Sequence, residues 1–270
     1  MHYIDEGSGD PILFLHGNPA SSYLWRNIIP HLTPYARCIA PDLIGMGKSD
    51  KPDLDYRFSD HSKYVEGFIE ELGLSNITLV IHDWGSGLGF HYAMRNEDNV
   101  KAIAFMEALV KPFYWADFPK DFKTGFKLMR TPGLGWFMIS VMNAFIKQVM
   151  PQATVRSLTT EEKQYYAEPY KTIKSRKPIR QWPLEIPIDG KPANMLEVIS
   201  SYSKKLQNSN VPKLLFYADP GGIIDAKGLE WCKENLKNLK TVDIGEGMHY
   251  LQEDNPHLIG EELAKWYKSL

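Results

Sequence analysis

The sequence of 270 residues contains little cysteine and no long hydrophobic run. No apolar stretch approaches the roughly 20 residues that a membrane-spanning helix requires, so we expect no transmembrane segment. The two cysteines, Cys38 and Cys232, are too few for a disulfide framework and show no metal-binding spacing. The start of the chain lacks the positive and then apolar pattern of a signal peptide. These absences together predict a soluble cytoplasmic protein.

Neither positive nor negative charge is in clear excess. The chain has 31 basic and 33 acidic residues and a formal net charge of −2. This balance excludes the basic footprint of a nucleic-acid-binding protein and a polybasic patch for a membrane surface. Tryptophan and tyrosine are plentiful instead, at 7 and 14 residues. Such a composition suits a ligand pocket and equally a large core.

Apolar runs alternate with helical patterns at both ends of the chain. The runs are short, uninterrupted and rich in β-branched residues, as in buried parallel strands. We expect strands at 11–15, 37–40, 77–81, 100–106, 213–217 and 240–244. We expect helices at 21–32, 64–72, 88–94, 229–236 and from 256 onward, with Ser59 and Asp60 as the N-cap of the second. The alternation predicts an α/β fold whose mostly parallel sheet is flanked by helices.

Between residues 108 and 211 this rhythm stops. No clear strand pattern appears there, aromatic residues and methionines are dense, and 133–149 and 195–206 have helical spacing. We interpret 108–211 as a mainly helical cap region over the carboxyl edge of the sheet. Residues 1–107 and 212–270 then form the core domain.

The stretch from Ile77 to Gly87 is the most informative part of the sequence. It runs from a buried strand through an acid and a large aromatic residue into a helix that begins with glycines. Strand, abrupt turn and helix form a nucleophile elbow, which raises one side chain above the end of a sheet. Here that side chain is Asp83 instead of serine.

Two other residues follow strands in the same way. Glu107 ends the strand at 100–106, and His249 lies in the loop after 240–244. Taken alone, each has an ordinary explanation: Asp83 as a helix cap, Glu107 as a surface acid, His249 as a loop residue. Together they occur in the order nucleophile, acid and histidine at one sheet edge. Asp219, just past the strand at 213–217, is a second candidate for the acid.

Two glycine-rich stretches imitate nucleotide-binding motifs. Gly47-Lys48-Ser49 resembles the end of a phosphate-binding loop, but the earlier glycine that the loop needs is replaced by Asp42. The glycines at 85, 87 and 89 follow a strand, as in a dinucleotide-binding fingerprint. Their third glycine comes one position early, and Asp83 would place an anion where a pyrophosphate approaches. Neither stretch is interpreted as a nucleotide site.

Four motifs together resemble the haloalkane dehalogenases of the α/β-hydrolase superfamily. They are His16–Pro19, Pro41–Asp50, Ile81–Ser86 and Gly247–Asp254. The resemblance covers the whole chain, including the cap, and is closest to the subfamily with an Asp-His-Glu triad and an Asn-Trp halide-binding pair. It implies a cap inserted after the sixth strand of the fold. Members usually begin with roughly two dozen further residues, so the resemblance also implies that the N-terminal edge strand is missing here.

The resemblance assigns a role to five residues. Asp83 matches the nucleophile, His249 the base and Glu107 the acid, while Asn18 and Trp84 match the pair that holds the leaving halide. The implied reaction is hydrolysis of a haloalkane to an alcohol, a halide ion and a proton, through an alkyl ester on Asp83. It needs water but no metal or organic cofactor. The expected state is a monomer or a weak homo-oligomer, without nucleic-acid or membrane partners.

A capped pocket would favour small to medium apolar substrates. Candidate lining residues are Phe118, Phe126, Phe145, Ile186, Ile223 and Leu251.

Three other functions fit part of the pattern. Epoxide hydrolases share the Asp-His-acid machinery but protonate the opened oxygen with cap tyrosines. The cap tyrosines available here are Tyr114, Tyr165, Tyr166 and Tyr170. Coelenterazine-type luciferases, which are monooxygenases, have a similar scaffold and retain the triad. A receptor that only binds a ligand in a capped pocket is the non-enzymatic alternative.

Overall fold

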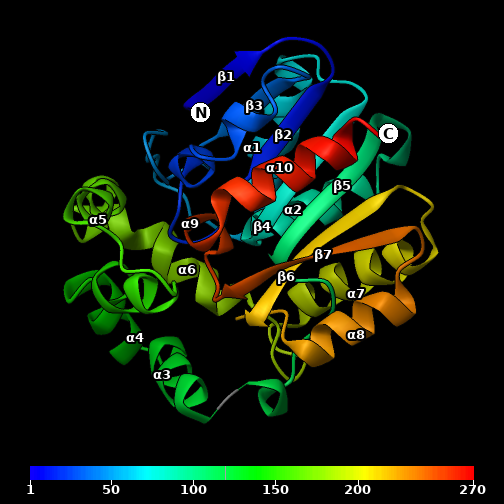
Figure 1. Ribbon diagram of the computed structural model, residues 1–270. Helices are drawn as coiled ribbons and strands as arrows, with labels where there is room; N and C mark the ends of the chain where they lie inside the picture. Colours follow the sequence, from blue (N-terminus) through cyan, green and yellow to red (C-terminus); the bar gives the residue numbers. More distant parts are fainter. Residues whose placement is uncertain (119) are drawn as a thin grey trace.

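A computed structural model describes residues 1–118 and 120–270, without the side chains of residues 120 and 121. Its centre is a seven-stranded sheet with the strand order β1-β3-β2-β4-β5-β6-β7 (Figure 1). The strands are β1 (Tyr3–Gly7), β2 (Pro11–Leu15), β3 (Arg37–Pro41), β4 (Ile77–Asp83), β5 (Val100–Ala108), β6 (Lys213–Pro220) and β7 (Leu239–Gly247). Only the edge strand β1 pairs antiparallel, with β3, and the other pairings are parallel. The predicted α/β class and mostly parallel sheet are confirmed.

Helices cover both faces of the sheet because its strands are apolar on both sides. Successive side chains of β2 belong to different cores: Leu13 and Leu15 face one, Ile12 and Phe14 the other. The flanking helices are α1 (Phe58–Glu71), α2 (Trp84–Ala93), α7 (Ala193–Asn208), α8 (Ala226–Asn235), α9 (Leu251–Asp254) and α10 (Pro256–Tyr267). The first four of these helices contribute to the core on the first face, and α10 packs on the second.

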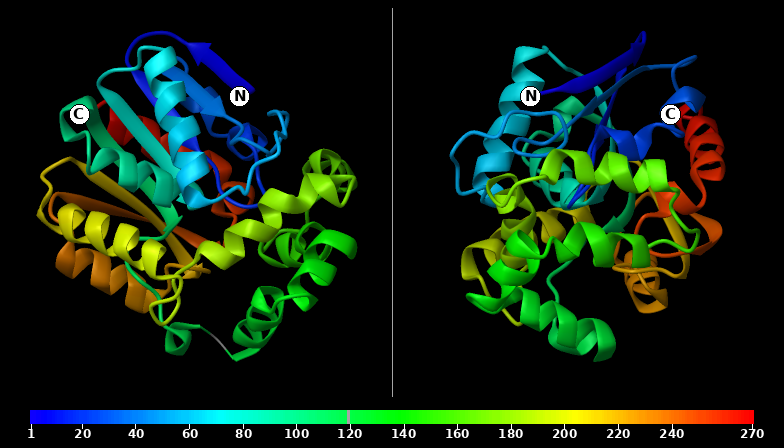
Figure 2. Two further views of the ribbon diagram at one scale, coloured as in Figure 1. Left: turned by 180° about the vertical axis from the view of Figure 1, so that it is seen from behind. Right: turned by 90° about the vertical axis from the view of Figure 1, so that its left-hand side faces the viewer.

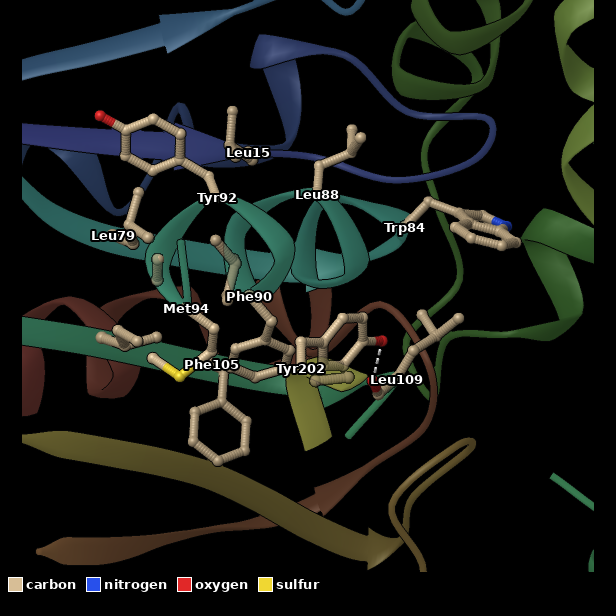
Figure 3. Packing of buried hydrophobic residues seen from close by; sticks show 14 of the residues in the cluster. Leu15, Leu79, Trp84, Leu88, Phe90, Tyr92, Met94, Phe105, Leu109 and Tyr202 are labelled. Carbon is tan, nitrogen blue, oxygen red and sulfur yellow. Dashed lines mark hydrogen bonds between the residues drawn. The ribbon is translucent and has the colours of Figure 1, made fainter. Parts of the chain in front are cut away.

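Close packing against β5 and α7 holds helix α2 on the sheet. Phe90 of α2 contacts the ring of Phe105 on β5 and that of Tyr202 on α7, at centroid distances of 5.4 and 5.7 Å (Figure 3). The Tyr202 hydroxyl donates a hydrogen bond of 2.5 Å to the carbonyl oxygen of Leu109, directly after β5. Helix α7 therefore belongs to a layer on the face of the sheet.

A group of helices between β5 and α7 lies to one side of the sheet in Figure 1 and in the left view of Figure 2. Its α-helices are α3 (Lys120–Arg130), α4 (Leu134–Trp136), α5 (Thr160–Ala167) and α6 (Lys177–Glu185). It has a small core of its own, made of Ile139, Phe145, Ile146, Tyr170 and Ile179. No helix in the described part of the chain is both long and apolar enough to cross a membrane.

The structure corrects three local predictions. The helix expected at 21–32 is two short 3₁₀ helices, Ser22–Trp25 and Ile29–His31, because Pro30 has no N–H with which to continue a helix. Helix α1 begins at Phe58, whose N–H reaches the carboxylate of Glu185 at 3.3 Å. The segment 133–149 is broken, and Asn143 has a φ of 57° at the break.

Removing the buried hydroxyl of Tyr202 tests the packing behind the site. Tyr202→Phe keeps the ring but leaves the carbonyl of Leu109 without its donor, which should lower the free energy of unfolding by about 1–3 kcal/mol. Urea unfolding measures the change. Tyr35→Phe, at a side chain that is 47% exposed, is the matched control and should have no measurable effect. Equal stability of the two variants would contradict this account.

Candidate active site

The carboxyl ends of β2, β4, β5 and β7 bring four polar residues together. Asp83 ends β4, Glu107 lies one residue before the end of β5, and Asn18 and His249 lie in the loops after β2 and β7. In parallel strands these ends lie at the same edge of the sheet. Hydrogen bonds and one close charge pair join all four residues.

The turn after β4 holds Asp83 in an unusual backbone conformation. Its φ is 48° and its ψ is −126°, and its side chain makes no capping hydrogen bond to α2. Ser86 stabilises the turn, because its hydroxyl donates to the carbonyl of Asp83 at 2.5 Å and accepts from the N–H of Leu109 at 2.9 Å. A side chain at position 17 is excluded, since a Cβ there would lie 2.0 Å from Oδ1 of Asp83.

The two carboxylate oxygens of Asp83 have different surroundings. Oδ1 accepts the backbone N–H of Asn18 at 2.7 Å, whereas Oδ2 lies 3.6 Å from Nε2 of His249. Burial raises the pKa of Asp83, and the charge of His249 and the backbone N–H groups of Trp84 and Asn18 oppose that rise. One oxygen is thus held by backbone donors, while the other faces the imidazole.

Glu107 fixes the other side of the imidazole. Nδ1 of His249 lies 3.2 Å from Oε2 of Glu107, a carboxylate that is 1% exposed. The backbone N–H groups of Gly222, Ile223 and Ile224 donate to the same carboxylate at 3.0, 2.5 and 3.3 Å. These donors hold Glu107 so that Nδ1–H of the ring points to it and Nε2 points to Asp83.

Asp219, the second candidate for the acid, lies elsewhere. It is exposed near the end of β6, and the described residues include no hydrogen bond or ion pair between it and His249. The geometry therefore pairs His249 with Glu107.

Burial and neighbouring charges shift the pKa of His249 in opposite directions. Burial lowers the pKa of its imidazole, but the hydrogen bond to Glu107 and the negative charges of Asp83 and Glu107 outweigh this and leave the pKa raised. The ring therefore loses its proton at a higher pH than an isolated histidine does.

Trp84 and Asn18 place neutral N–H groups beside Asp83. The Trp84 indole is 1% exposed and projects from the start of α2 away from the sheet (Figure 3). It stacks on Trp182 of α6 with a centroid distance of 4.6 Å, and its N–H has no acceptor among the described residues. One N–H of the Asn18 amide donates to the carbonyl of Ile179 at 3.2 Å, which leaves the other free for a ligand.

Some contacts in the site were not found from the sequence. Nε2–H of His82 donates to the carbonyl of His249 at 2.8 Å, and the hydroxyl of Tyr250 donates to the carbonyl of Asn18 at 2.9 Å. Trp182 covers the indole of Trp84. The alternation of side chains along β4 could have placed His82 on the opposite face from its neighbours. No local signal points to the other two contacts, which join segments far apart in the chain.

The predicted pocket residues lie at different depths. Phe118 and Phe126 belong to an aromatic cluster, and the centroids of their rings lie 6.3 Å apart. Phe145 belongs to the same small core as Ile179. Ile186 and Ile223 pack against the core on one face of the sheet, and Leu251 belongs to the core on the other. These contacts do not place the six residues around one pocket, so the pocket lining stays a prediction.

The cap tyrosines also differ in exposure. Tyr114 and Tyr165 are 57% and 38% exposed, whereas Tyr166 and Tyr170 are buried. The hydroxyl of Tyr166 donates to the carboxylate of Glu253.

Comparison with known proteins identifies the family. A model of the alpha/beta hydrolase fold matches residues 10–131. A haloalkane dehalogenase of Mesorhizobium japonicum is 44% identical over 270 residues, which cover 98% of this chain and 87% of that protein. A haloalkane dehalogenase of Sphingobium indicum is 41% identical, and the match covers 100% of this chain and 92% of that protein. The chain belongs to the haloalkane dehalogenase family.

Solved structures of haloalkane dehalogenases agree with this. The structure of an ancestral haloalkane dehalogenase superposes with a TM-score of 0.97 at 45% identity, covering 99% of this chain and 95% of that one. The structure of a haloalkane dehalogenase from Bradyrhizobium elkani superposes with a TM-score of 0.97 at 42% identity, covering 99% of this chain and 93% of that one. The family and the α/β-hydrolase fold expected from the sequence are confirmed.

The electrostatics of the dehalogenase site can be tested on His249 directly. Glu107→Gln removes one of the negative charges that raise the pKa of this histidine, so the pKa should fall. An NMR titration of the imidazole measures it. Asp219→Asn removes an exposed charge without touching the ring and should leave the titration unchanged. A fall of the same size in both variants would contradict the assigned contact.

Proposed function

We propose that this chain hydrolyses carbon–halogen bonds of haloalkanes, with Asp83 as the nucleophile, His249 as the base and Glu107 as the acid that orients the base. The products are an alcohol, a halide ion and a proton. The observation that carries the proposal is the unequal setting of the two Asp83 oxygens. One is fixed by a backbone donor, and the other is open toward His249.

In the first step Oδ2 of Asp83 attacks the carbon that bears the halogen. A bond forms between Oδ2 and this carbon, the carbon–halogen bond breaks, and its electron pair leaves with the halide. Negative charge then develops on the departing halogen in an enclosed site. The indole N–H of Trp84 and the free amide N–H of Asn18 are neutral donors suited to that charge.

In the second step His249 activates a water molecule. The gap of 3.6 Å between Nε2 and Oδ2 is longer than a direct hydrogen bond and leaves the imidazole facing the ester. Water gives a proton to Nε2 while its oxygen attacks Cγ of Asp83. Oδ1 takes up the negative charge under the backbone N–H groups of Asn18 and Trp84. The Cγ–Oδ2 bond then breaks, and the alcohol leaves with Oδ2 and the proton from His249. Asp83 is left as a carboxylic acid that contains the oxygen of the water, and loss of its proton to solvent restores the carboxylate.

In this proposal residues 108–211 are the cap region of the core domain of 1–107 and 212–270. Within this region α3 to α6 act as the cap, whereas α7 packs on the face of the sheet. Helix α6 supports it, since Trp182 and Ile179 contact the two donors Trp84 and Asn18. A dry site under the cap favours apolar substrates, with Phe145 and the other predicted pocket residues as its lining. The reaction as proposed is cytoplasmic and uses no cofactor.

The surroundings of Tyr114, Tyr165 and Tyr166 do not favour epoxide hydrolysis. That reaction needs tyrosine hydroxyls directed at the substrate oxygen. Tyr166 instead donates to Glu253, and Tyr114 and Tyr165 are exposed. Relatives at 41–44% identity named haloalkane dehalogenase also favour halide chemistry over the luciferase reaction.

Loss of the nucleophile should abolish turnover. The purified protein should release bromide and acid from simple bromoalkanes, and Asp83→Ala should reduce the rate by roughly four orders of magnitude or more. Ion chromatography of bromide and pH-stat titration measure both products. Asp219→Asn is the control and should retain full activity. Turnover of epoxides or of a luciferin, without release of halide from a panel of haloalkanes, would disprove the proposal.

Loss of the base should stop the reaction between its two steps. His249→Gln leaves Asp83 able to attack but removes the group that activates water, so the alkyl ester should accumulate. Intact-protein mass spectrometry after incubation with 1-bromobutane should show the added mass of one butyl group. An unmodified mass in folded protein would count against Asp83 as the nucleophile.

A further inference from the structure

The loop that carries His249 is tied on both sides of this residue. The backbone N–H of Met248 donates to Oδ2 of Asp254 at 3.0 Å, and that of Tyr250 donates to the carbonyl of Ala153 at 3.0 Å. The partner of Met248 lies at the end of α9, whereas Ala153 lies in the segment between β5 and β6. Two separate parts of the chain therefore set the path of the loop.

A single carboxylate joins these two parts. Oδ1 of Asp254 accepts the backbone N–H groups of Val155 and Arg156 at 2.8 and 3.2 Å, while Oδ2 holds Met248. Hydrogen bonds from N–H groups to a carboxylate are roughly twice as strong as those between neutral groups. Asp254 thus connects the segment Ala153–Arg156 to the residue immediately before His249.

An ion-pair network keeps this segment in place. The Arg156 guanidinium donates to Glu253, which is fully buried, and to Glu162 of α5 at 2.8 Å. Arg26 donates to the same two carboxylates, at 2.7 Å to Glu253 and 2.8 Å to Glu162. Because two cations share two anions, the segment around Arg156 cannot shift without breaking several charged contacts.

We propose that Asp254 is a positioning residue for His249, and that through it the segment Ala153–Arg156 keeps the imidazole aligned with the ester on Asp83. This inference rests on the proposed function. Displacement of a catalytic group by about 1 Å can cost roughly 100-fold in rate. The attack of Asp83 on the haloalkane does not use His249, so the effect of Asp254 is confined to ester hydrolysis.

Asp254→Asn tests this role with little change in volume. The asparagine keeps one acceptor oxygen and so cannot accept both from Met248 and from Val155 and Arg156. The first burst of bromide from 1-bromobutane, followed by rapid quench, should keep its rate within about twofold. Steady-state turnover should fall about tenfold or more, and the butyl ester should become the main species during turnover. Asp254→Ser, with a shorter side chain, should have the same effect.

Asp243→Asn is the matched control. Asp243 lies on β7, the strand that precedes the His249 loop, and its exposed carboxylate accepts hydrogen bonds from the backbone N–H of Gly245 at 2.8 Å and from the hydroxyl of Tyr217 on the neighbouring strand β6. This variant should match the wild type in burst and steady state. The inference is overturned if folded Asp254→Asn slows both steps equally or neither. Absence of bromide release by the wild type would overturn the proposed function instead, which keeps the two failures distinct.

Discussion

The left-handed turn at Asp83 is the constraint on which the rest of the site depends. A non-glycine residue held at positive φ costs roughly 1–3 kcal/mol and persists only where the surroundings determine it. Here β4 ends in a buried sheet, α2 starts against β2, and Ser86 bridges the turn to Leu109. Glycines allow this closeness, since a Cβ at Gly85 would lie 2.1 Å from the carbonyl oxygen of Leu15. Packing from three strands, β2, β4 and β5, thus holds Asp83 in this strained conformation.

The charge of Asp83 depends on neighbours that no single element supplies. Burial alone raises its pKa and favours the neutral acid, which is a poor nucleophile. The N–H of Asn18 comes from the loop after β2, that of Trp84 from α2, and the positive charge of His249 from the loop after β7. Glu107 of β5 raises the pKa of this histidine in turn. The sheet therefore acts as a frame that brings two N–H donors and one positive charge to one carboxylate.

Sequence patterns predicted those parts of the fold that local physics determines. The apolar runs placed the strands β2 to β7 but not the edge strand β1, whose sequence has no apolar run. The positions just beyond the strands placed Asp83, Glu107 and His249 at one edge. Patterns failed where contacts between distant segments decide the outcome. The N–H of Phe58 at the start of α1 reaches the carboxylate of Glu185, which lies in a different helix. The bonds of Asp254 to Val155 could not be predicted for the same reason, since nothing in either segment indicates the other.

The helices between β5 and β6 help to shape the site as well as to cover it. The carbonyl of Ile179 holds one N–H of the Asn18 amide, which fixes the direction of the other. Trp182 lies against the face of Trp84 at 4.6 Å and so limits the rotation of the indole. Both residues belong to α6, so any displacement of α6 would turn both N–H donors at once. A single helix therefore orients both N–H donors of the site.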